Sequence, residues 1–540
     1  MISSAKPYVW LVLLFISVAL IASCNGNQSQ DSPTQNPPAQ TGDDDNDNND
    51  DTSSNVDDDD LSDDDSVADD DTISSECNIM QVIVNDPPEG NPLARRLTIK
   101  TDQPCKLSGM IASPDLEGYG LSAPDDSADG LQHELMFYGL AEEHQFNYQI
   151  FQAGREQEVK AEGDFHVSAL PEDVIRPLRH TNLPEADPRT WVVMILPVNY
   201  KPHIGGVILI LDRDANLRFY HEILRPEDRP LMMLAALNLL SDGSFVYDNL
   251  NEVNQVKLDG SEEVLYAPQI QQPYFNAMHH QFYIADDLSR SLLVFNMIGN
   301  GYGCDGVTPS TNVVGDGVVE VDANGVEQWR WSVFDHTDQI PLDSMDFQMC
   351  EHESAFWGSG DVDWTHGNSV FPVPGEDAFV VALRNVSRVV KIDRATGDIM
   401  WQAGRGLDFQ WIGEEPPEEQ WFNFEHDAKI LPNGNLLLFD NHFMDTSPTW
   451  SRALEIQLDQ EAMTARRVWE YRVSYTFAHG TVYRLEDGHT LITNGNGMNA
   501  YEVTADNVLV WSAEMPRQQD GSVGLLSRAV PYPALWTYEP

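Results

Sequence analysis

Residues 318–331 read VVEVDANGVEQWRW, an apolar strand that ends in acidic residues and leads through a turn into a strand that carries tryptophan. Looser copies of this unit recur at 207–220 (VILILDRDANLRFY), 389–401 (VVKIDRATGDIMW) and 500–511 (AYEVTADNVLVW). Helical periodicity is scarce along the rest of the folded region. Short apolar strands separated by turns therefore predict an all-β fold.

A second repeated unit is a hairpin that begins with histidine. Residues 426–439 (HDAKILPNGNLLLF) turn at Asn-Gly and residues 479–492 (HGTVYRLEDGHTLI) turn at Asp-Gly, two dipeptides that are strong hairpin signals. Units of two hairpins that repeat along a chain are typical of β-propeller blades. The sequence therefore predicts a β-propeller domain over residues 190–540.

The region before the propeller has a different pattern. Residues 77–171 contain short alternating runs at 80–84, 97–101, 133–138 and 146–153, and Pro, Gly and Asp turns separate them. This pattern predicts an N-terminal β-sandwich domain of fibronectin or immunoglobulin type.

Residues 1–24 have the pattern of a lipoprotein signal peptide. Lys6 supplies the positive charge, residues 8–20 are almost wholly apolar, and the small residues Ala22 and Ser23 precede Cys24. The apolar run is shorter than the roughly 20 residues that a membrane-spanning helix needs. We therefore expect export and acylation of Cys24, with a periplasmic or cell-surface location and the lipid as the only membrane contact.

Residues 25–76 form an acidic segment with clusters of Asp and almost no apolar side chains, which predicts a disordered linker. Calcium-binding loops need a Gly between their acidic ligands and a spaced terminal acid, and the Asp clusters within residues 43–71 do not have this pattern. The whole chain has a formal net charge of −56, and acids outnumber Lys and Arg outside this segment as well. This charge disfavours nucleic-acid binding.

The cysteines are consistent with an oxidising compartment. With Cys24 acylated, Cys77, Cys105, Cys304 and Cys350 remain as an even set. Proximity in sequence favours the pairs Cys77–Cys105 and Cys304–Cys350, and two other pairings stay open. A homodimer is compatible with the sequence, which does not fix the oligomeric state.

Histidine recurs at the start of successive hairpins, at His280, His366, His426 and His479. Equivalent positions of propeller blades surround one axial channel, so these imidazoles are expected to converge. Imidazole is a nucleophile and base near neutral pH, and its cation is a hydrogen-bond donor. One such histidine is more simply explained as a strand contact, whereas four favour a site.

A set of motifs carries a family resemblance. Residues 363–369 (DWTHGNS), Leu383-Arg384, 389–401, 425–428 (EHDA), 431–436 (LPNGNL) and 439–441 (FDN) together resemble the bacterial aryl-sulfate sulfotransferase family. The resemblance covers most of residues 77–540. It implies a six-bladed propeller that moves a sulfuryl group from a phenolic sulfate ester to a phenol, without a nucleotide sulfate donor, a cofactor or a metal.

The resemblance also implies roles for individual residues. His426 matches the histidine that becomes transiently sulfated, and His366, Asn368 and Arg384 match the supporting motif. His280 is the expected counterpart of the remaining family histidine, with His279 beside it as the alternative.

These residue types suit the chemistry. Arg384 and the Asn368 amide can bind the sulfuryl oxygens, and His426 can attack sulfur in line. A protonated His280 or His366 can donate to the departing aryl oxygen and later take the proton of the acceptor phenol.

Two positions depart from the family pattern. Glu425 stands directly before His426 where a neutral amide is expected, and a carboxylate there would raise the imidazole pKa or repel an anionic donor. His442 follows residues 440–441 where Gly is expected.

Three other functions compete. The first is a non-catalytic propeller that serves as a binding or surface-interaction lipoprotein, because fold alone does not decide activity. The second is a quinone-dependent dehydrogenase, suggested by residues 393–401 (DRATGDIMW). The third is a metal site built from His280, His366 and His426. The joint presence of His426, His366, Asn368 and Arg384 favours the sulfotransferase.

Overall fold

The structure is a computed structural model that describes residues 76–125, 130–198, 203–224, 234–249, 252–269, 274–303, 308–342, 362–443, 449–517 and 524–537. The signal peptide, Cys24, the acidic linker, Cys304 and Cys350 lie outside the described residues. The described part of the chain is almost entirely β-strand, which confirms the all-β prediction. Its helices are one short α-helix, α2 (Pro417–Gln420), and two 3-10 turns, η1 (Val333–His336) and η2 (Arg384–Val386). None of these helices has the length and hydropathy required to cross a membrane.

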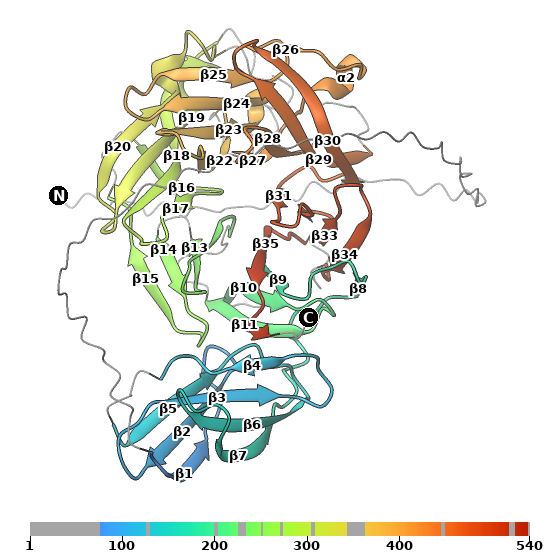
Figure 1. Ribbon diagram of the computed structural model, residues 1–540. Coiled ribbons are helices and arrows are strands. Elements are labelled where there is room, and N and C mark those ends of the chain that lie inside the picture. The colour runs from blue at the N-terminus through green and yellow to red at the C-terminus, as the bar shows by residue number, and fades with distance from the viewer. Residues whose placement is uncertain are drawn as a thin grey trace, which may run out of the picture. The chain divides into compact units, whose positions relative to one another are not determined.

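The N-terminal region folds into two sheets (Figure 1). The first has the order β1-β2-β5, from strands Ile79–Val84, Arg95–Thr101 and Gln132–Phe137. The second has the order β36-β4-β3-β6-β7, from strands Trp536–Thr537, Tyr119–Leu121, Leu107–Ala112, Gln145–Gln152 and Val159–His166. Buried and more exposed residues alternate along β2 and β3, as expected for sheets with one face on a core.

The C-terminus is tied to this region. Strand β36 pairs with β4, and Trp536 packs edge-on against Phe146 with ring centroids 5.9 Å apart. Arg218 Nη1, from the following part of the chain, donates a hydrogen bond of 3.1 Å to the Gly139 carbonyl. The last strand therefore closes a sheet that begins more than 400 residues earlier in the sequence.

The rest of the chain forms mainly antiparallel sheets, most of them built from consecutive strands, and β21 and β26 add parallel pairs at two sheets (Figure 1). Four sheets are simple meanders at their centre. They comprise β12 (Leu237–Leu239), β13 (Phe245–Asp248), β14 (Val253–Val256) and β15 (Glu262–Tyr266); β16 (Tyr274–Met278), β18 (Arg290–Tyr302), β19 (Pro309–Asp322) and β20 (Glu327–Ser332), with β17 (Tyr283–Ile284) and β21 (Val362–Asp363) beside them; β22 (Gly367–Pro372), β23 (Ala378–Leu383), β24 (Arg388–Asp393) and β25 (Ile399–Ala403); and β27 (His426–Ile430), β28 (Leu436–Asp440), β29 (Trp450–Asp459) and β30 (Thr464–Ser474), with β26 (Gln410–Trp411).

Two further sheets combine strands from distant parts of the chain. One consists of β31 (Thr481–Arg484), β32 (Thr490–Asn494), β33 (Asn499–Val503) and β34 (Leu509–Glu514), with β8 (Arg179–Asn182) at its edge. The other has the order β11-β10-β9-β35, from Leu217–Leu224, Ile204–Leu211, Thr190–Pro197 and the C-terminal strand Arg528–Pro533. In Figure 1 the red β35 accordingly lies beside the green β9.

The predicted repeats are confirmed as hairpins. Residues 318–331 form the end of β19, a turn and β20, and the Asp322 carboxylate accepts the backbone N–H groups of Asn324 and Val326 within that turn. The Asn-Gly and Asp-Gly turns join β27 to β28 and β31 to β32. Gly434 and Gly488 have φ values of 83° and 87°, a backbone conformation that glycine adopts without steric cost.

Neighbouring sheets meet through their first strands. Gln281, before β17, forms a bridge with Ser369 of β22, and its side chain bonds Asn238 of β12. The β27 carboxylate of Asp427 accepts the N–H of Val482 in β31 and the guanidinium of Arg528 in β35. Strand starts that are distant in sequence are thus brought together.

Cys77 and Cys105 form a disulfide, which matches the preferred pairing. We expect that the double substitution of both cysteines by serine will lower the stability of the N-terminal sheets by about 3–4 kcal/mol, because the bond closes a loop of this size in the unfolded chain. Hydrogen exchange of the β1 and β3 amides at increasing urea concentration measures the change. Exchange identical to that of the wild type would contradict a bond between these two cysteines.

Candidate functional site

The histidine cluster, defined as His279, His280, His366, His426 and His479, lies where several first strands begin. The ring centroid of His280 is 4.9 Å from that of His366, 5.9 Å from that of His479 and 6.2 Å from that of His426. The rings of His426 and His479 lie 6.0 Å apart and nearly parallel. The structure therefore brings together all four histidines that the sequence singled out, with His280 at the centre.

The backbone around the cluster is unusual. His280, His366 and His479 have φ values of 61°, 50° and 57°, in the left-handed region that side chains other than glycine and asparagine rarely adopt. Each such residue costs about 1–2 kcal/mol. In the fourth hairpin the left-handed residue is Asp427, with φ 58°, so His426 precedes the strained position. The expectation that all four histidines occupy one register is corrected at this point.

The buried His426 imidazole has a neutral hydrogen-bond partner. Its Nδ1 lies 2.7 Å from Asn441 Oδ1, and the Asn441 amide donates to the carbonyls of Thr476 and His479 at 3.0 and 2.9 Å. Because two carbonyls need the NH₂ group, the Asn441 oxygen must face the imidazole. Nδ1 therefore carries the proton and Nε2 carries the lone pair. Nε2 accepts a long hydrogen bond of 3.2 Å from the backbone N–H of His479.

Two other imidazoles have carboxylate partners. His366 Nδ1 lies 2.5 Å from Asp363 Oδ2. His279 Nε2 lies 3.1 Å from Asp316 Oδ1, and the other Asp316 oxygen accepts the Thr365 hydroxyl at 2.5 Å. His279 stands behind His280, with 2.7 Å between their Nδ1 atoms, so His280 is the one that faces His366, His426 and His479.

Burial disfavours the charged form of three imidazoles of the cluster. Burial lowers the pKa of His280 well below its ordinary value, and repulsion from the neighbouring histidines adds to this effect. Burial followed by the charge of Arg384 does the same to the pKa of His426, and the Asn441 hydrogen bond offsets it only partly. Burial and the charge of Arg528 lower the pKa of His479 to about 4. These three imidazoles are bases in their neutral form at pH 7.

Arg384 and Asn368 lie buried beside the cluster. The Arg384 guanidinium donates to Asn385 Oδ1 at 2.7 Å, and its Cζ lies 5.0 Å from the centre of the Phe424 ring. The Asn368 amide donates at 2.6 Å to the carbonyl of Glu425, the residue before His426. Asn368 thus supports the backbone at His426, in addition to the donor role expected from sequence.

Glu425 does not act as a carboxylate in this structure. Its side chain is fully buried, and no side chain of the described residues donates a hydrogen bond to it. Burial raises the pKa of Glu425 well above its usual range, and repulsion from Asp440 adds to the shift, while Arg384 opposes it. The expectation that Glu425 raises the His426 pKa is therefore corrected: burial favours the neutral form of the Glu425 carboxyl, and the pKa of His426 is lowered.

The other departure, His442, lies outside the cluster. Its ring stacks on Trp450 with 3.8 Å between centroids. Sequence reasoning did not assign Asn441, Asp316 and Asp363 to the site. Asn441 belongs to the FDN motif and Asp363 lies three residues before His366, so both had a local signal, whereas Asp316 had none.

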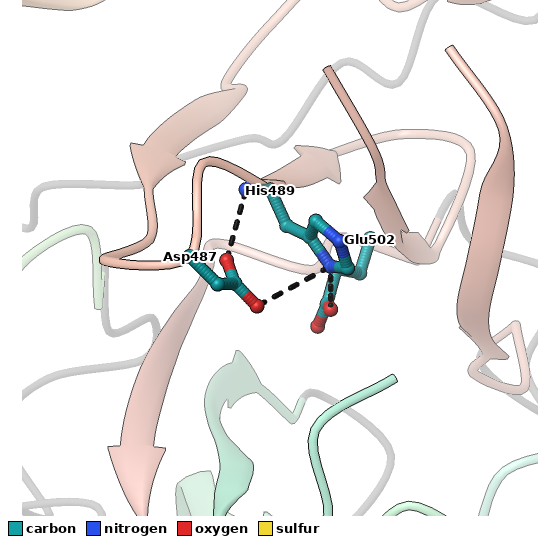
Figure 2. Close-up of side chains that lie close together, drawn as sticks. All are labelled: Asp487, His489 and Glu502. Carbon is teal, nitrogen blue, oxygen red and sulfur yellow. Dashed lines mark hydrogen bonds and ion pairs between the residues drawn. The ribbon is translucent and has the colours of Figure 1, made fainter. Parts of the chain in front are cut away.

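One group of possible metal ligands lies elsewhere, in the hairpin of β31 and β32 and the adjacent β33. Figure 2 shows that the side chains of Asp487, His489 and Glu502 point toward one another, with ligand atoms within 4.8 Å. His489 Nδ1 lies 2.9 Å from Glu502 Oε1, and Arg213 Nη1 lies 2.6 Å from Oε2 of the same carboxylate. Hydrogen bonding and an ion pair already account for this arrangement. Among the described residues His280, His366 and His426 do not form such a close ligand group.

The sequence pattern of the arylsulfotransferase (ASST) family matches residues 189–520, which is more than half of the chain. The chain therefore belongs to the arylsulfotransferase family. None of the curated proteins matches the sequence significantly.

Several solved structures resemble the fold at low identity. A protein of unknown function from Bacteroides caccae aligns with a TM-score of 0.39 and 13% identity, over 64% of this chain and 99% of that one. TolB from Acinetobacter baumannii gives 0.35 and 11%, over 73% and 80%. A catalytically inactive virginiamycin B lyase from Staphylococcus aureus gives 0.31 and 11%, over 64% and 89%.

Replacement of Glu425 by glutamine tests the neutral carboxyl. Because the folded-state pKa is raised, the difference in stability between wild type and Glu425→Gln should be smallest at pH 4 and below, where the folded wild type keeps this proton and most of the unfolded wild type does too. As the pH rises, the unfolded wild type releases this proton and the folded protein does not, so wild type should lose up to about 1.4 kcal/mol per pH unit relative to the variant.

Thermal unfolding at pH 4, 6 and 8 measures this difference, with the exposed Glu418→Gln in α2 as the matched control. A wild type that gains stability over Glu425→Gln as the pH rises would show an ionised Glu425 paired with Arg384.

Proposed function

We propose that this arylsulfotransferase-family chain transfers a sulfuryl group from a phenolic sulfate to a phenol through a sulfated His426. The observation that carries the proposal is the fixed tautomer of His426. The Asn441 oxygen accepts a hydrogen bond from Nδ1–H, so the proton stays on Nδ1 and Nε2 is an unprotonated nucleophile in a buried site. The alternative, a binding module without catalysis, does not explain why a buried imidazole is held in this one form.

Attack on sulfur forms a bond between Nε2 and sulfur and breaks the bond between sulfur and the aryl oxygen. The product is an imidazolium N-sulfonate. Its Nδ1 keeps its proton and continues to donate a hydrogen bond to Asn441 Oδ1. Because Asn441 is neutral, it does not stabilise the imidazolium as a carboxylate would. The intermediate thus remains reactive, and neutral imidazole is the leaving group when the acceptor phenol attacks.

Positive charge and backbone donors suit the sulfuryl oxygens. The charge of Arg384 reaches both His426 and His479, since it lowers the pKa of both imidazoles. The sulfur must displace the N–H of His479 from Nε2 in order to approach along the lone pair. That N–H is then placed to donate to a sulfuryl oxygen, in the manner of an oxyanion hole.

The aryl oxygen requires a group that gives and takes a proton. His280 and His366 are neighbours within the cluster, and each is connected to a carboxylate. His366 contacts Asp363 directly, and His280 reaches Asp316 through His279. A carboxylate partner favours the imidazolium form and so favours acid–base work over nucleophilic attack.

The proposal extends to the architecture and location. The six sheets from β9 to β35 would be blades of a six-bladed propeller over residues 190–540, with β35 and β9–β11 closing the ring, and residues 77–171 would form a β-sandwich. Acylation of Cys24 would anchor this exported protein to a bacterial membrane through residues 25–76.

The full-length chain in detergent should release 4-nitrophenol from 4-nitrophenyl sulfate, and added phenol should accelerate the release and yield phenyl sulfate. His426→Ala should lower the rate by roughly 10³-fold or more, because no other group supplies the nucleophile. His489→Ala, which changes the hairpin in Figure 2, is the matched control and should keep wild-type activity. Folded wild type without transfer across several donors would favour the binding module.

Asn441→Ala should reduce both activity and stability. The imidazole of His426 loses the partner that fixes its tautomer, so the rate constant of transfer should fall by about 10-fold to 100-fold. The carbonyls of Thr476 and His479 lose their donors, which should cost about 1–3 kcal/mol. Steady-state kinetics and urea unfolding measure the two effects, and wild-type kinetics in this variant would argue against a fixed tautomer.

A further inference from the structure

A line of buried contacts leads from His280 through His279 to the carboxylate of Asp316, away from His426 and His479. His280 Nδ1 lies 2.7 Å from His279 Nδ1, and His279 Nε2 lies 3.1 Å from Asp316 Oδ1. Asp316 also accepts the Thr365 hydroxyl. His279 and Asp316 are both about 96% or more buried. A connected path of hydrogen-bonding atoms therefore runs from the site to a buried carboxylate.

The two atoms at the end of this path depend on one another. His279 Nε2 and Asp316 Oδ1 are both buried, and neither atom forms a hydrogen bond with any group among the described residues, so each has the other, at 3.1 Å, as its ion-pair partner. Burial alone would raise the pKa of Asp316, but the interaction with His279 outweighs it and lowers the pKa, so the carboxylate is ionised. An ionised, buried carboxylate favours a positive charge on the imidazole beside it.

The proposed transfer reaction requires a group that stores a proton, which is a role that His279 and Asp316 together suit. The departing aryl oxygen takes up a proton, and the acceptor phenol later returns one. His280 is a poor store for that proton, because burial and the neighbouring histidines disfavour its cation. His279, unlike His280, lies directly against a carboxylate, that of Asp316.

We propose that His279, held against Asp316, is a positioning residue that stores the proton exchanged between His280 and the aryl oxygen. This inference rests on the proposed sulfuryl transfer and deepens it, because it assigns the acid–base work to His280. His366, with its direct Asp363 contact, then orients the substrate.

The proton balance closes over the two half-reactions. In the proposed resting state the pair holds one additional proton between the two Nδ1 atoms, on the His279 side, so that His279 Nδ1–H donates to His280 Nδ1 and His280 carries its own proton on Nε2. When the bond between sulfur and the aryl oxygen breaks, the oxygen receives the electron pair and takes the His280 Nε2 proton, while the His279 Nδ1 proton moves to His280 Nδ1. In the second half-reaction the acceptor phenol gives its proton to His280 Nε2, and the Nδ1 proton returns to His279.

The other titratable groups of the site act on this pair and belong in any interpretation of its pH dependence. His280 faces the rings of His279, His366, His426 and His479, and His279 faces Asp316 and the ring of His366. Arg384 and Arg528 add positive charge near His426 and His479. The test therefore varies the leaving group rather than the pH.

The decisive variant is His279→Gln. A glutamine amide can donate to Asp316 and turn its oxygen toward His280 Nδ1, so it keeps a polar contact on both sides, but it cannot donate to His280 from that oxygen or hold an additional proton. Asp316→Asn is the second variant, and it removes the charge that favours the His279 cation. His489→Gln is the matched control, since it makes the same change at a carboxylate-bonded histidine in the outer hairpin.

Two donors separate proton storage from a structural role. In the full-length protein, His279→Gln should slow transfer from phenyl sulfate by about 10²-fold, because its basic leaving oxygen needs a proton. Transfer from 4-nitrophenyl sulfate should fall by less than about threefold, because that oxygen departs without one. Asp316→Asn should show the same selectivity. Equal losses for both donors, or no loss for either, would overturn the inference.

A second measurement does not depend on turnover. Selective [¹⁵N]histidine labelling should show one strongly downfield imidazole proton that correlates with two rings in the wild type and is absent in His279→Gln. A wild-type spectrum without this proton would overturn the inference even if transfer is observed. Conversely, the proton with no detectable transfer would support the pair and reject the proposed function.

Discussion

The burial of several imidazoles within contact distance of one another is the constraint on which the site depends. Charged forms of His280, His426 and His479 are disfavoured by lost hydration, and Arg384 and Arg528 add repulsion. The cluster therefore supplies neutral bases together with fixed positive charge. An anionic sulfate ester fits this combination. The guanidinium attracts its negative charge, and the neutral imidazole keeps the lone pair that attacks sulfur.

Similar rings acquire different functions through the groups behind them. A neutral amide holds His426, and carboxylates stand behind His366 and His279. A carboxylate stabilises an imidazolium and so suits a proton carrier, whereas an amide fixes the tautomer without adding charge. Chain topology brings the rings together, and these partners distinguish them. The buried, neutral Glu425 agrees with this reading, since a charge beside His426 would oppose binding of an anionic donor.

Much of this arrangement could be predicted from sequence. Period-two runs and Asn-Gly or Asp-Gly turns specify hairpins locally, and their repetition made the all-β fold and the convergence of His280, His366, His426 and His479 predictable. The charge state of Glu425 could not be predicted, because it depends on burial by distant segments. Asp316 was equally hidden, since it lies in the middle of the long strand β19 and reaches His279 only in the folded chain.

His426 differs from the other histidines in that it precedes the left-handed residue of its hairpin. The sequence shows a difference at this point, but the difference alone does not predict the backbone conformation. Glycine follows His366 and His479, whereas Asp427 follows His426. Asp427 takes the left-handed position of this hairpin, and its buried carboxylate accepts Lys429 and Arg528 at 2.8 Å. The strained backbone is thus held by an ion-pair network, and His426 is free of that strain. The ring of the proposed nucleophile is consequently placed by neutral contacts, with the Asn441 amide and with the backbone of Phe424 and His479, whereas carboxylates contact His366 and His279.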